Sequence, residues 1–221
     1  KAIFNKAIKS EIVARDAYPF THYRIKSTPT EKRALDIDSI KSIMFLKMEE
    51  TDSLFHYRNY FLASYMLYGI SFMDLAFLKA QNIIDNRIKF QRRKTSKPYD
   101  INITPQLKEI LSFYLKDKDK SEFIFPIIKR DTFELQYKDV LWARKRYNKG
   151  LKVIAKKCKI EQRLTSYVSR HSFATQAMLQ DVPLQAISSM LGHNRLSTTQ
   201  IYLKTLPNDI LDNYNQKLVK L

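Results

Sequence analysis

The sequence has one cysteine and only three glycines in 221 residues. With Cys158 alone the chain can form no intramolecular disulfide and no cysteine-rich zinc site, which excludes secreted disulfide scaffolds and zinc fingers. The isolated glycines leave no room for a GxGxxG motif or a P-loop, so any phosphate must be bound by side chains. There is no apolar run of about eighteen residues and no signal-peptide pattern, so we expect an intracellular, cytoplasmic protein without a membrane segment.

Acidic residues are scarce relative to basic ones. The 39 Lys and Arg outweigh 22 Asp and Glu, giving a net charge of +17, and such a balance is typical of proteins that bind a polyanion. Residues 138–170 alone hold eleven basic residues against two acidic ones. This segment is either a solvated helix face or part of a DNA-binding surface. Because 44% of the residues are hydrophobic, the chain is long and apolar enough to bury one sizeable core.

Apolar periodicity predicts a mainly α-helical fold with one small antiparallel β-sheet, an α+β class. The strands are expected in the segments RIKFQRRK and YDINI, which form a hairpin around the turn-prone TSKP. Asp36 and Pro105 are expected at helix starts. Helices are expected near residues 1–14, 37–48, 54–69, 71–80, 106–117, 132–157, 168–180, 183–191 and 196–204, followed by an amphipathic tail over about 207–221.

The segment SYVSRHSFATQAMLQDVPLQAISSMLGHNRLSTTQIY contains three motifs in a fixed order. Arg170 opens an Arg-His-Ser-Phe-Ala-Thr run, His193 ends a Leu-Gly-His turn 23 residues later, and Tyr202 ends a Thr-Thr-x-x-Tyr segment after nine more. The chain thereby resembles the tyrosine recombinases, or phage integrases, over about residues 30–221, and is most similar to integrases of Bacteroides-type mobile elements.

The resemblance implies the catalytic-domain fold of that family and a reaction in which DNA strands are broken and rejoined through a 3′-phosphotyrosyl intermediate. Tyr202 would be the nucleophile, and its phenol, with a usual pKa of ~10, needs help in losing its proton. Arg170 suits a transition state that spreads negative charge over phosphate oxygens. His193 would donate to the same phosphate or transfer a proton. Lys94 would protonate the departing 5′ oxygen, or would be an ordinary solvated strand lysine.

Two positions depart from the family pattern. The first catalytic arginine, usual in a Gly-x-Arg-x-x-Glu frame, is replaced by Ser71, which supplies no positive charge. Arg92, expected on the same strand face as Lys94, is our candidate replacement. Three residues before Arg170, where the family has a histidine, stands Tyr167, which either points its hydroxyl at the phosphate or packs.

Residues 1–25 are expected to be the end of an N-terminal core-binding (SAM-like) domain and the start of a linker. Residues 26–221 would form the catalytic domain, with a tail that docks on a neighbouring protomer or on its own domain. Partners implied by the resemblance are double-stranded DNA attachment sites, a homo-tetramer on DNA that is a monomer without it, and accessory DNA-bending or directionality factors, all at the bacterial nucleoid. The basic side chains expected to contact DNA are Arg93, Lys97, Arg144, Lys145 and Arg146.

Covalent tyrosine chemistry conserves the energy of the broken phosphodiester, so no metal, ATP or other cofactor is expected. Two other readings stay open. A type IB topoisomerase-like enzyme would use the same chemistry but rejoin the original strand. A DNA-binding domain that has lost catalysis would explain Ser71, although it would have no need of Tyr202 at this spacing.

Overall fold

The computed structural model describes residues 1–23 and 34–203 together with positions 212, 215, 216 and 219. Most of the expected tail, residues 207–221, lies outside these described residues. The chain divides into two units, Lys1–Lys32 and Arg33–Leu221. Within the described segments, every helix is too short or too polar to cross a membrane.

The N-terminal unit is a short helix followed by a small aromatic cluster. Helix α1 (Ala2–Lys9) and the 3-10 turn η1 (Arg15–Ala17) are its regular elements. The rings of Phe4, Tyr18 and Phe20 meet edge to face, with centroids 5.6 to 6.4 Å apart. The helix is shorter than the expected 1–14 because Glu11 takes a positive φ of 57° and turns the chain.

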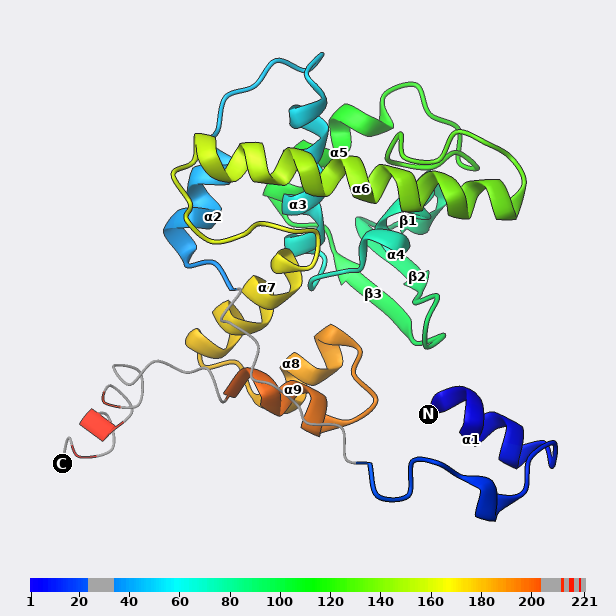
Figure 1. Ribbon diagram of the computed structural model, residues 1–221. Coiled ribbons are helices and arrows are strands. Elements are labelled where there is room, and N and C mark those ends of the chain that lie inside the picture. Colours follow the sequence, from blue (N-terminus) through cyan, green and yellow to red (C-terminus); the bar gives the residue numbers. More distant parts are fainter. Residues whose placement is uncertain (24–33, 204–211, 213–214, 217–218, 220–221) are drawn as a thin grey trace. The chain divides into compact units, whose positions relative to one another are not determined.

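The second unit is mainly helical with one small antiparallel sheet, which confirms the expected fold class (Figure 1). Its helices are α2 (Ile37–Met44), α3 (Ser53–Met66), α4 (Phe72–Ala76), the 3-10 turn η2 (Ala80–Asn82), α5 (Pro105–Leu115), α6 (Phe133–Lys157), α7 (Val168–Leu179), α8 (Leu184–Leu191) and α9 (Leu196–Leu203). Its strands are β1 (Ile83–Ile84), β2 (Arg87–Gln91) and β3 (Pro98–Asn102).

Side-chain caps fix several helix starts as the sequence suggests. The Asp36 carboxylate accepts a hydrogen bond of 2.7 Å from the Ser39 amide at the start of α2. At the start of α5, Thr104 accepts from the Leu107 amide, and Pro105 occupies the first turn, where no intrahelical N–H bond is lost.

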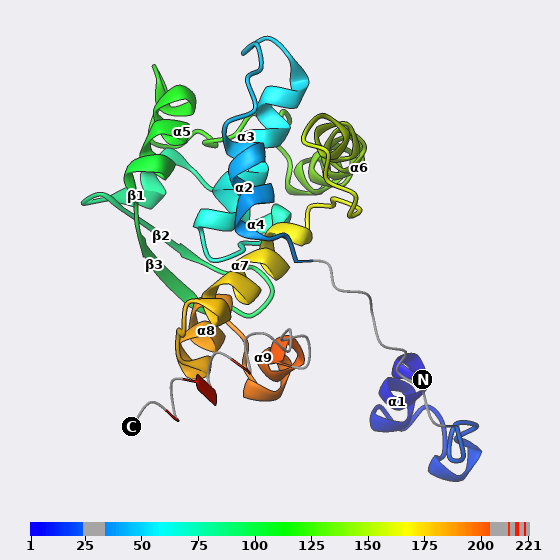
Figure 2. The ribbon, with the colours of Figure 1, turned by 90° about the vertical axis from the view of Figure 1, so that its left-hand side faces the viewer.

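Helix α3 lies at the centre of the main core. It packs against α2, α4, α5, α6 and α7, and Figure 2 shows α6 end-on on one side of α3 with the sheet on the other. Phe61 and Leu67 are fully buried, as is Tyr147 of α6, whose ring stacks on Phe72. The apolar sequence of α3 on all sides therefore reflects burial on all sides.

The sheet has the order β1-β2-β3, and Ile88 pairs with Ile101 in the expected hairpin. Strand β2 ends at Gln91 rather than at Lys94, because the Arg92 carbonyl accepts hydrogen bonds from the Thr95 and Ser96 amides and reverses the chain. Lys94 thus lies in the β2–β3 turn. The expectation that Arg92 and Lys94 share a strand face was wrong.

A second, smaller apolar cluster joins α7 to α8. Ala174 and Met178 of α7 pack there on Ile187 and Leu191 of α8. The N-terminal end of α7 belongs to the main core through Val168. Helix α7 therefore connects the two cores.

Candidate active site

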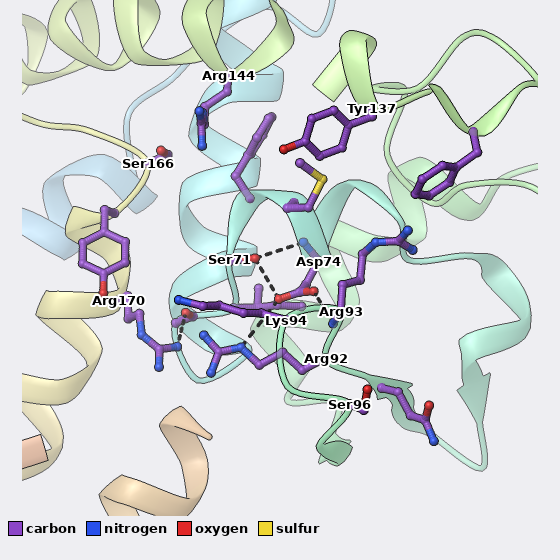
Figure 3. Close-up of a pocket in the computed structure, with 17 residues that line it drawn as sticks. Ser71, Asp74, Arg92, Arg93, Lys94, Ser96, Tyr137, Arg144, Ser166 and Arg170 are labelled. Atoms are coloured by element: carbon purple, nitrogen blue, oxygen red, sulfur yellow. Dashed lines mark hydrogen bonds and ion pairs between the residues drawn. The ribbon is translucent and has the colours of Figure 1, made fainter. Parts of the chain in front are cut away.

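A cavity of about 950 Å³ opens between α4, the β2–β3 turn, α6 and the start of α7. Figure 3 shows Arg92, Lys94 and Arg170 pointing into the same part of it. Segments far apart in the sequence thus bring three cationic side chains together. This cavity contains or borders most of the residues that the sequence analysis selected.

Ser71 and Asp74 form the wall of the cavity at the start of α4. The Ser71 hydroxyl accepts from the Asp74 amide at 3.1 Å and donates to the Asp74 carboxylate at 2.7 Å. Asp74 is only 5% exposed, and a buried carboxylate must be paired or hydrogen-bonded. Ser71 therefore serves as a helix cap and as a partner of a buried acid.

The Asp74 carboxylate contacts two neighbouring arginines, whose side chains point in different directions. Its Oδ1 accepts from the Arg93 backbone amide at 3.0 Å, and its Oδ2 lies 3.8 Å from Arg92 Nε. The Arg93 side chain instead lies over the Phe77 ring, 3.9 Å from its centroid, and Figure 3 shows it directed away from Arg92. Arg92 is therefore the arginine on the Arg170 side of the cavity.

Arg92 and Arg170 meet at the end of α8. Arg92 Nη1 donates to the carbonyls of Leu191 at 3.2 Å and Gly192 at 3.1 Å. Arg170 Nη2 donates to the same Leu191 carbonyl, and its Nη1 donates to Gly69 O at 3.0 Å. Carbonyl acceptors thus fix the two guanidinium groups beside one another, in a site where Arg170 is 4% exposed.

Gly192 makes this close approach possible. It ends α8 with a φ of +65°, in the left-handed region that favours glycine. A Cβ atom there would lie 2.1 Å from the Tyr99 hydroxyl and 3.3 Å from Arg92 Nη1. The glycine therefore lets the turn before His193 lie directly against the hairpin.

His193 is hydrogen-bonded through both ring nitrogens. Its Nε2 lies 3.0 Å from Arg170 Nη2, and its Nδ1 lies 2.8 Å from the hydroxyl of Thr199 in α9. Burial, together with the positive charges of Arg170, Arg92 and Lys97, lowers the pKa of His193 to about 4. His193 is therefore neutral at physiological pH.

Lys94 and Tyr167 both line the cavity. Lys94 is exposed, and its amine end lies near the guanidinium groups of Arg92 and Arg170 in Figure 3. Tyr167 is the residue just before α7 and is 52% exposed, with its ring edge-on to that of His171 at 4.7 Å. Tyr167 therefore does not pack in the core.

Tyr202 lies in α9, which packs against α7 and α8. Its backbone follows Thr199 by three residues, so the two positions lie about one helical turn apart. Its side chain lies outside the described part of the chain. The helices that contribute Arg170, His193 and Tyr202 are therefore in mutual contact.

A model of the phage integrase family matches residues 45–208 of the chain. The chain belongs to this family, the tyrosine recombinases. The expected similarity to integrases of Bacteroides-type elements stays a prediction.

Three curated relatives illustrate the match to this tyrosine recombinase. The integrase of Escherichia phage P2 is 28% identical over 144 residues, which are 65% of this chain and 36% of that protein. The recombinase XerA of Thermococcus onnurineus is 32% identical over 62% of this chain and 46% of its own length. XerD of Halalkalibacterium halodurans is 40% identical over 33% of this chain and 24% of its own length. The chain thus spans less than half of each of these proteins.

Solved structures support the same fold. A crystal structure of XerA recombinase superposes with a TM-score of 0.62 at 19% identity, covering 97% of this chain and 72% of that one. The Tn1549 transposon integrase, in complex with a circular intermediate DNA, gives a TM-score of 0.65 at 14% identity, covering 98% and 76%. At these identities the similarity establishes the tyrosine recombinase fold of the chain.

The residues expected to contact DNA are divided between the cavity and its surroundings. Arg93 and Arg144 line the cavity, and both are exposed. Lys97 donates to the Ser189 carbonyl at 3.4 Å, which gives it a contact within the protein. Lys145 and Arg146 lie exposed on α6 outside the cavity lining.

Three residues of the site, Asp74, Thr199 and Tyr99, were not predicted from the sequence. Asp74 could have been predicted from the sequence, because it occupies the acidic position of the Gly-x-Arg-x-x-Glu frame that begins at Gly69. Thr199 lies within the Thr-Thr-x-x-Tyr motif, but nothing in that spacing indicated a bond to His193. The position of Tyr99 against Gly192 depends on a contact between residues more than ninety positions apart.

Proposed function

We propose that this chain is the catalytic part of a site-specific DNA recombinase that integrates or excises a mobile element. The observation that carries the proposal is the shared Leu191 carbonyl, to which both Arg92 and Arg170 donate beside His193. Two fixed guanidinium groups next to an imidazole form a binding site for a phosphate that gains charge in its transition state. The family's order of arginine, histidine and tyrosine motifs points to the same reaction.

Arg92 replaces the arginine that is absent at Ser71. Ser71 has no charge, and its hydroxyl bonds Asp74. The Asp74 carboxylate in turn lies 3.8 Å from Arg92 Nε, so the acid of the α4 start fixes an arginine from the hairpin. The number of cations in the site is thereby kept, although one of them comes from a different element.

The proposed step transfers a phosphoryl group from DNA to Tyr202. The tyrosine Oη forms a bond to phosphorus as the bond from phosphorus to the 5′ oxygen breaks. The phenol proton passes to His193, and the 5′ oxygen takes a proton from Lys94. Attack by the 5′ hydroxyl of a partner strand on the phosphotyrosine reverses the step and rejoins the DNA, so no cofactor is consumed. Tyr167, which lines the cavity, is proposed to donate a hydrogen bond from its hydroxyl to the same phosphate.

The partners follow from this function. The lambda integrase structure is described as a dimer bound to a core site, with a TM-score of 0.62 at 16% identity over 90% of this chain and 68% of that one. We propose that this chain likewise binds double-stranded DNA attachment sites and assembles on them as a homo-tetramer. Accessory DNA-bending or directionality factors would assist it, at the bacterial nucleoid. Residues 1–25 would then be the end of a core-binding domain. Arg93, Arg144, Lys145 and Arg146 would contact the DNA backbone.

A nicked suicide substrate, built from the ends of the element that encodes the protein, tests the function. The wild type should form a protein–DNA adduct that resists denaturant, and Tyr202→Phe should form none. Salt-sensitive binding without an adduct would instead support a DNA-binding domain that has lost catalysis, for which Ser71 is the favouring observation. Relaxation of supercoils without a specific site would support the type IB topoisomerase reading.

The role of Arg92 has a matched control in the next residue. Arg92→Ala should abolish the adduct or slow its formation by about 10²-fold or more, the typical cost of one transition-state donor. Arg93→Ala removes the same charge from a side chain that points away from Arg170, so it should weaken DNA binding without a comparable loss in the rate of adduct formation at saturating DNA. The opposite order would refute the proposed replacement.

A further inference from the structure

Thr199 is the one fully buried hydroxyl residue in the described part of α9. It has no exposed surface, and its Oγ1 lies 2.8 Å from His193 Nδ1. The proposed function assigns no role to this residue. In the sequence Thr199 lies between His193 and Tyr202, and its hydrogen bond connects the histidine to the helix that carries the tyrosine.

The partner on the other side of the ring decides where the imidazole proton lies. An arginine N–H can only donate, so His193 Nε2 must accept the bond from Arg170 Nη2. A neutral imidazole carries one proton, and Nε2 therefore lacks it. The proton lies on Nδ1, which donates to the Thr199 hydroxyl oxygen.

The same hydrogen bond connects the histidine to the helix of the nucleophile. Thr199 precedes Tyr202 by three residues in α9, so the two positions share a helix face. The bond from His193, which follows the end of α8, thus holds α9 at its first turns. Ring orientation and helix position are set by one contact.

Resting on the function proposed above, we infer that Thr199 is a positioning residue, which holds His193 in the Nδ1–H tautomer and directs the unprotonated Nε2 toward the reaction centre. In this form Nε2 can accept the phenol proton of Tyr202 once the phosphate takes over the Nη2 hydrogen bond of Arg170, whose Nη1 stays bonded to the Gly69 carbonyl. The opposite tautomer would present an N–H at Nε2 and could accept nothing there. A threonine hydroxyl can donate or accept, so the contact with Arg170 sets the tautomer, and the Thr199 hydroxyl stabilises this base form by accepting the bond from Nδ1–H.

Two substitutions separate the hydroxyl from the shape of the side chain. Thr199→Val keeps the volume and removes the hydrogen bond, whereas Thr199→Ser keeps the hydroxyl. The first measurement is a long-range ¹H–¹⁵N correlation spectrum of the imidazole groups of the chain near neutral pH, with His193 assigned from the signals lost in His193→Gln. The second is the single-turnover rate of adduct formation on the suicide substrate.

We expect the wild type and Thr199→Ser to show Nδ1 protonated and Nε2 unprotonated. Thr199→Val should shift His193 toward the Nε2–H form and slow adduct formation by about 10- to 100-fold, as loss of a residue that orients a catalytic histidine typically does. Thr199→Ser should recover most of the rate.

Three results would overturn the inference. These are a wild-type His193 protonated on Nε2, a Thr199→Val variant with an unchanged tautomer, and an equal rate loss in both variants, which would indicate packing alone. The spectrum needs no reaction, so it tests the tautomer even if the wild type forms no adduct. Absence of the adduct would count against the proposed function, while the spectrum alone would judge the role of Thr199.

Discussion

Gly69→Ala should damage the protein at the point where α3 leads into the cavity. Gly69 has a φ of +66°, and a Cβ added there would lie 2.6 Å from the Arg170 Cα and 2.9 Å from its Cβ. The left-handed conformation costs an L-residue about 1–2 kcal/mol, and crowding against a fixed backbone costs typically about 1–3 kcal/mol. We therefore expect a loss of about 2–5 kcal/mol in the free energy of unfolding.

Urea unfolding followed by circular dichroism measures this loss. Gly150→Ala is the control, because its Cβ would also be crowded, 2.2 Å from Tyr57 Cδ2, but against a side chain and at a position of α6 that does not line the cavity. Alanine also improves helix propensity at position 150 by about 1 kcal/mol, which offsets part of that crowding.

Activity should distinguish the two variants more sharply than stability. The Gly69 carbonyl accepts from Arg170 Nη1 at 3.0 Å, so moving this segment displaces the guanidinium. At equal folded fraction, adduct formation should fall in Gly69→Ala and stay near the wild-type rate in Gly150→Ala. A loss below about 1 kcal/mol with unchanged activity in Gly69→Ala would refute the reasoning.

Three further predictions concern buried hydroxyls, pH and salt. Among the described residues the buried Tyr147 hydroxyl has no hydrogen-bond partner, whereas the Tyr114 hydroxyl has two. In urea unfolding, Tyr147→Phe should be neutral or stabilising, and Tyr114→Phe should lower the free energy of unfolding by about 1–3 kcal/mol. The reverse order would contradict this prediction. The pKa of His193 is lowered to about 4 in the folded state, so the unfolded state binds a proton on this imidazole more readily. As the pH falls from about 6.5 to 4, the wild type should therefore lose stability that His193→Asn keeps. An equal pH dependence of the free energy of unfolding in both proteins would count against this prediction. Lys145→Ala combined with Arg146→Ala should lower the slope of log affinity against log salt by about 0.9 per lost phosphate contact, measured by fluorescence anisotropy on duplex DNA; an unchanged slope would mean that these side chains do not contact phosphates.

Local signals in the sequence predicted most helices and the hairpin. Asp36 and Pro105 start helices as expected, and the apolar sequence around Phe61 forms the central helix. The end of β2 was misjudged because the reversal at Arg92 depends on hydrogen bonds to its own carbonyl and on the Asp74 carboxylate bound to the next amide. Strand propensity contains no information about either contact.

The sequence motifs predicted several residues of the candidate site, but not the contacts between elements that bring them together. Arg170 and His193 could be selected from their spacing, and they are hydrogen-bonded in the structure. Arg92 was selected by an argument about strand faces that proved wrong, although its side chain does point to the Arg170 side of the cavity. What brings it there is a contact with the end of α8, a hundred residues away in the sequence, which no local pattern encodes.

The separate small cluster between α7 and α8 has a consequence for how the protein opens. Among the residues that the structure describes, a few apolar side chains such as Met178 and Leu191 hold that end together, whereas α3 is surrounded by the main core. Opening the α8 end therefore exposes far less apolar surface than global unfolding does. Backbone amides of α8 should exchange with deuterium long before those of α3. The segment that holds His193 can thus rearrange as its own cooperative unit while α3 and the start of α7, with Arg170, stay folded.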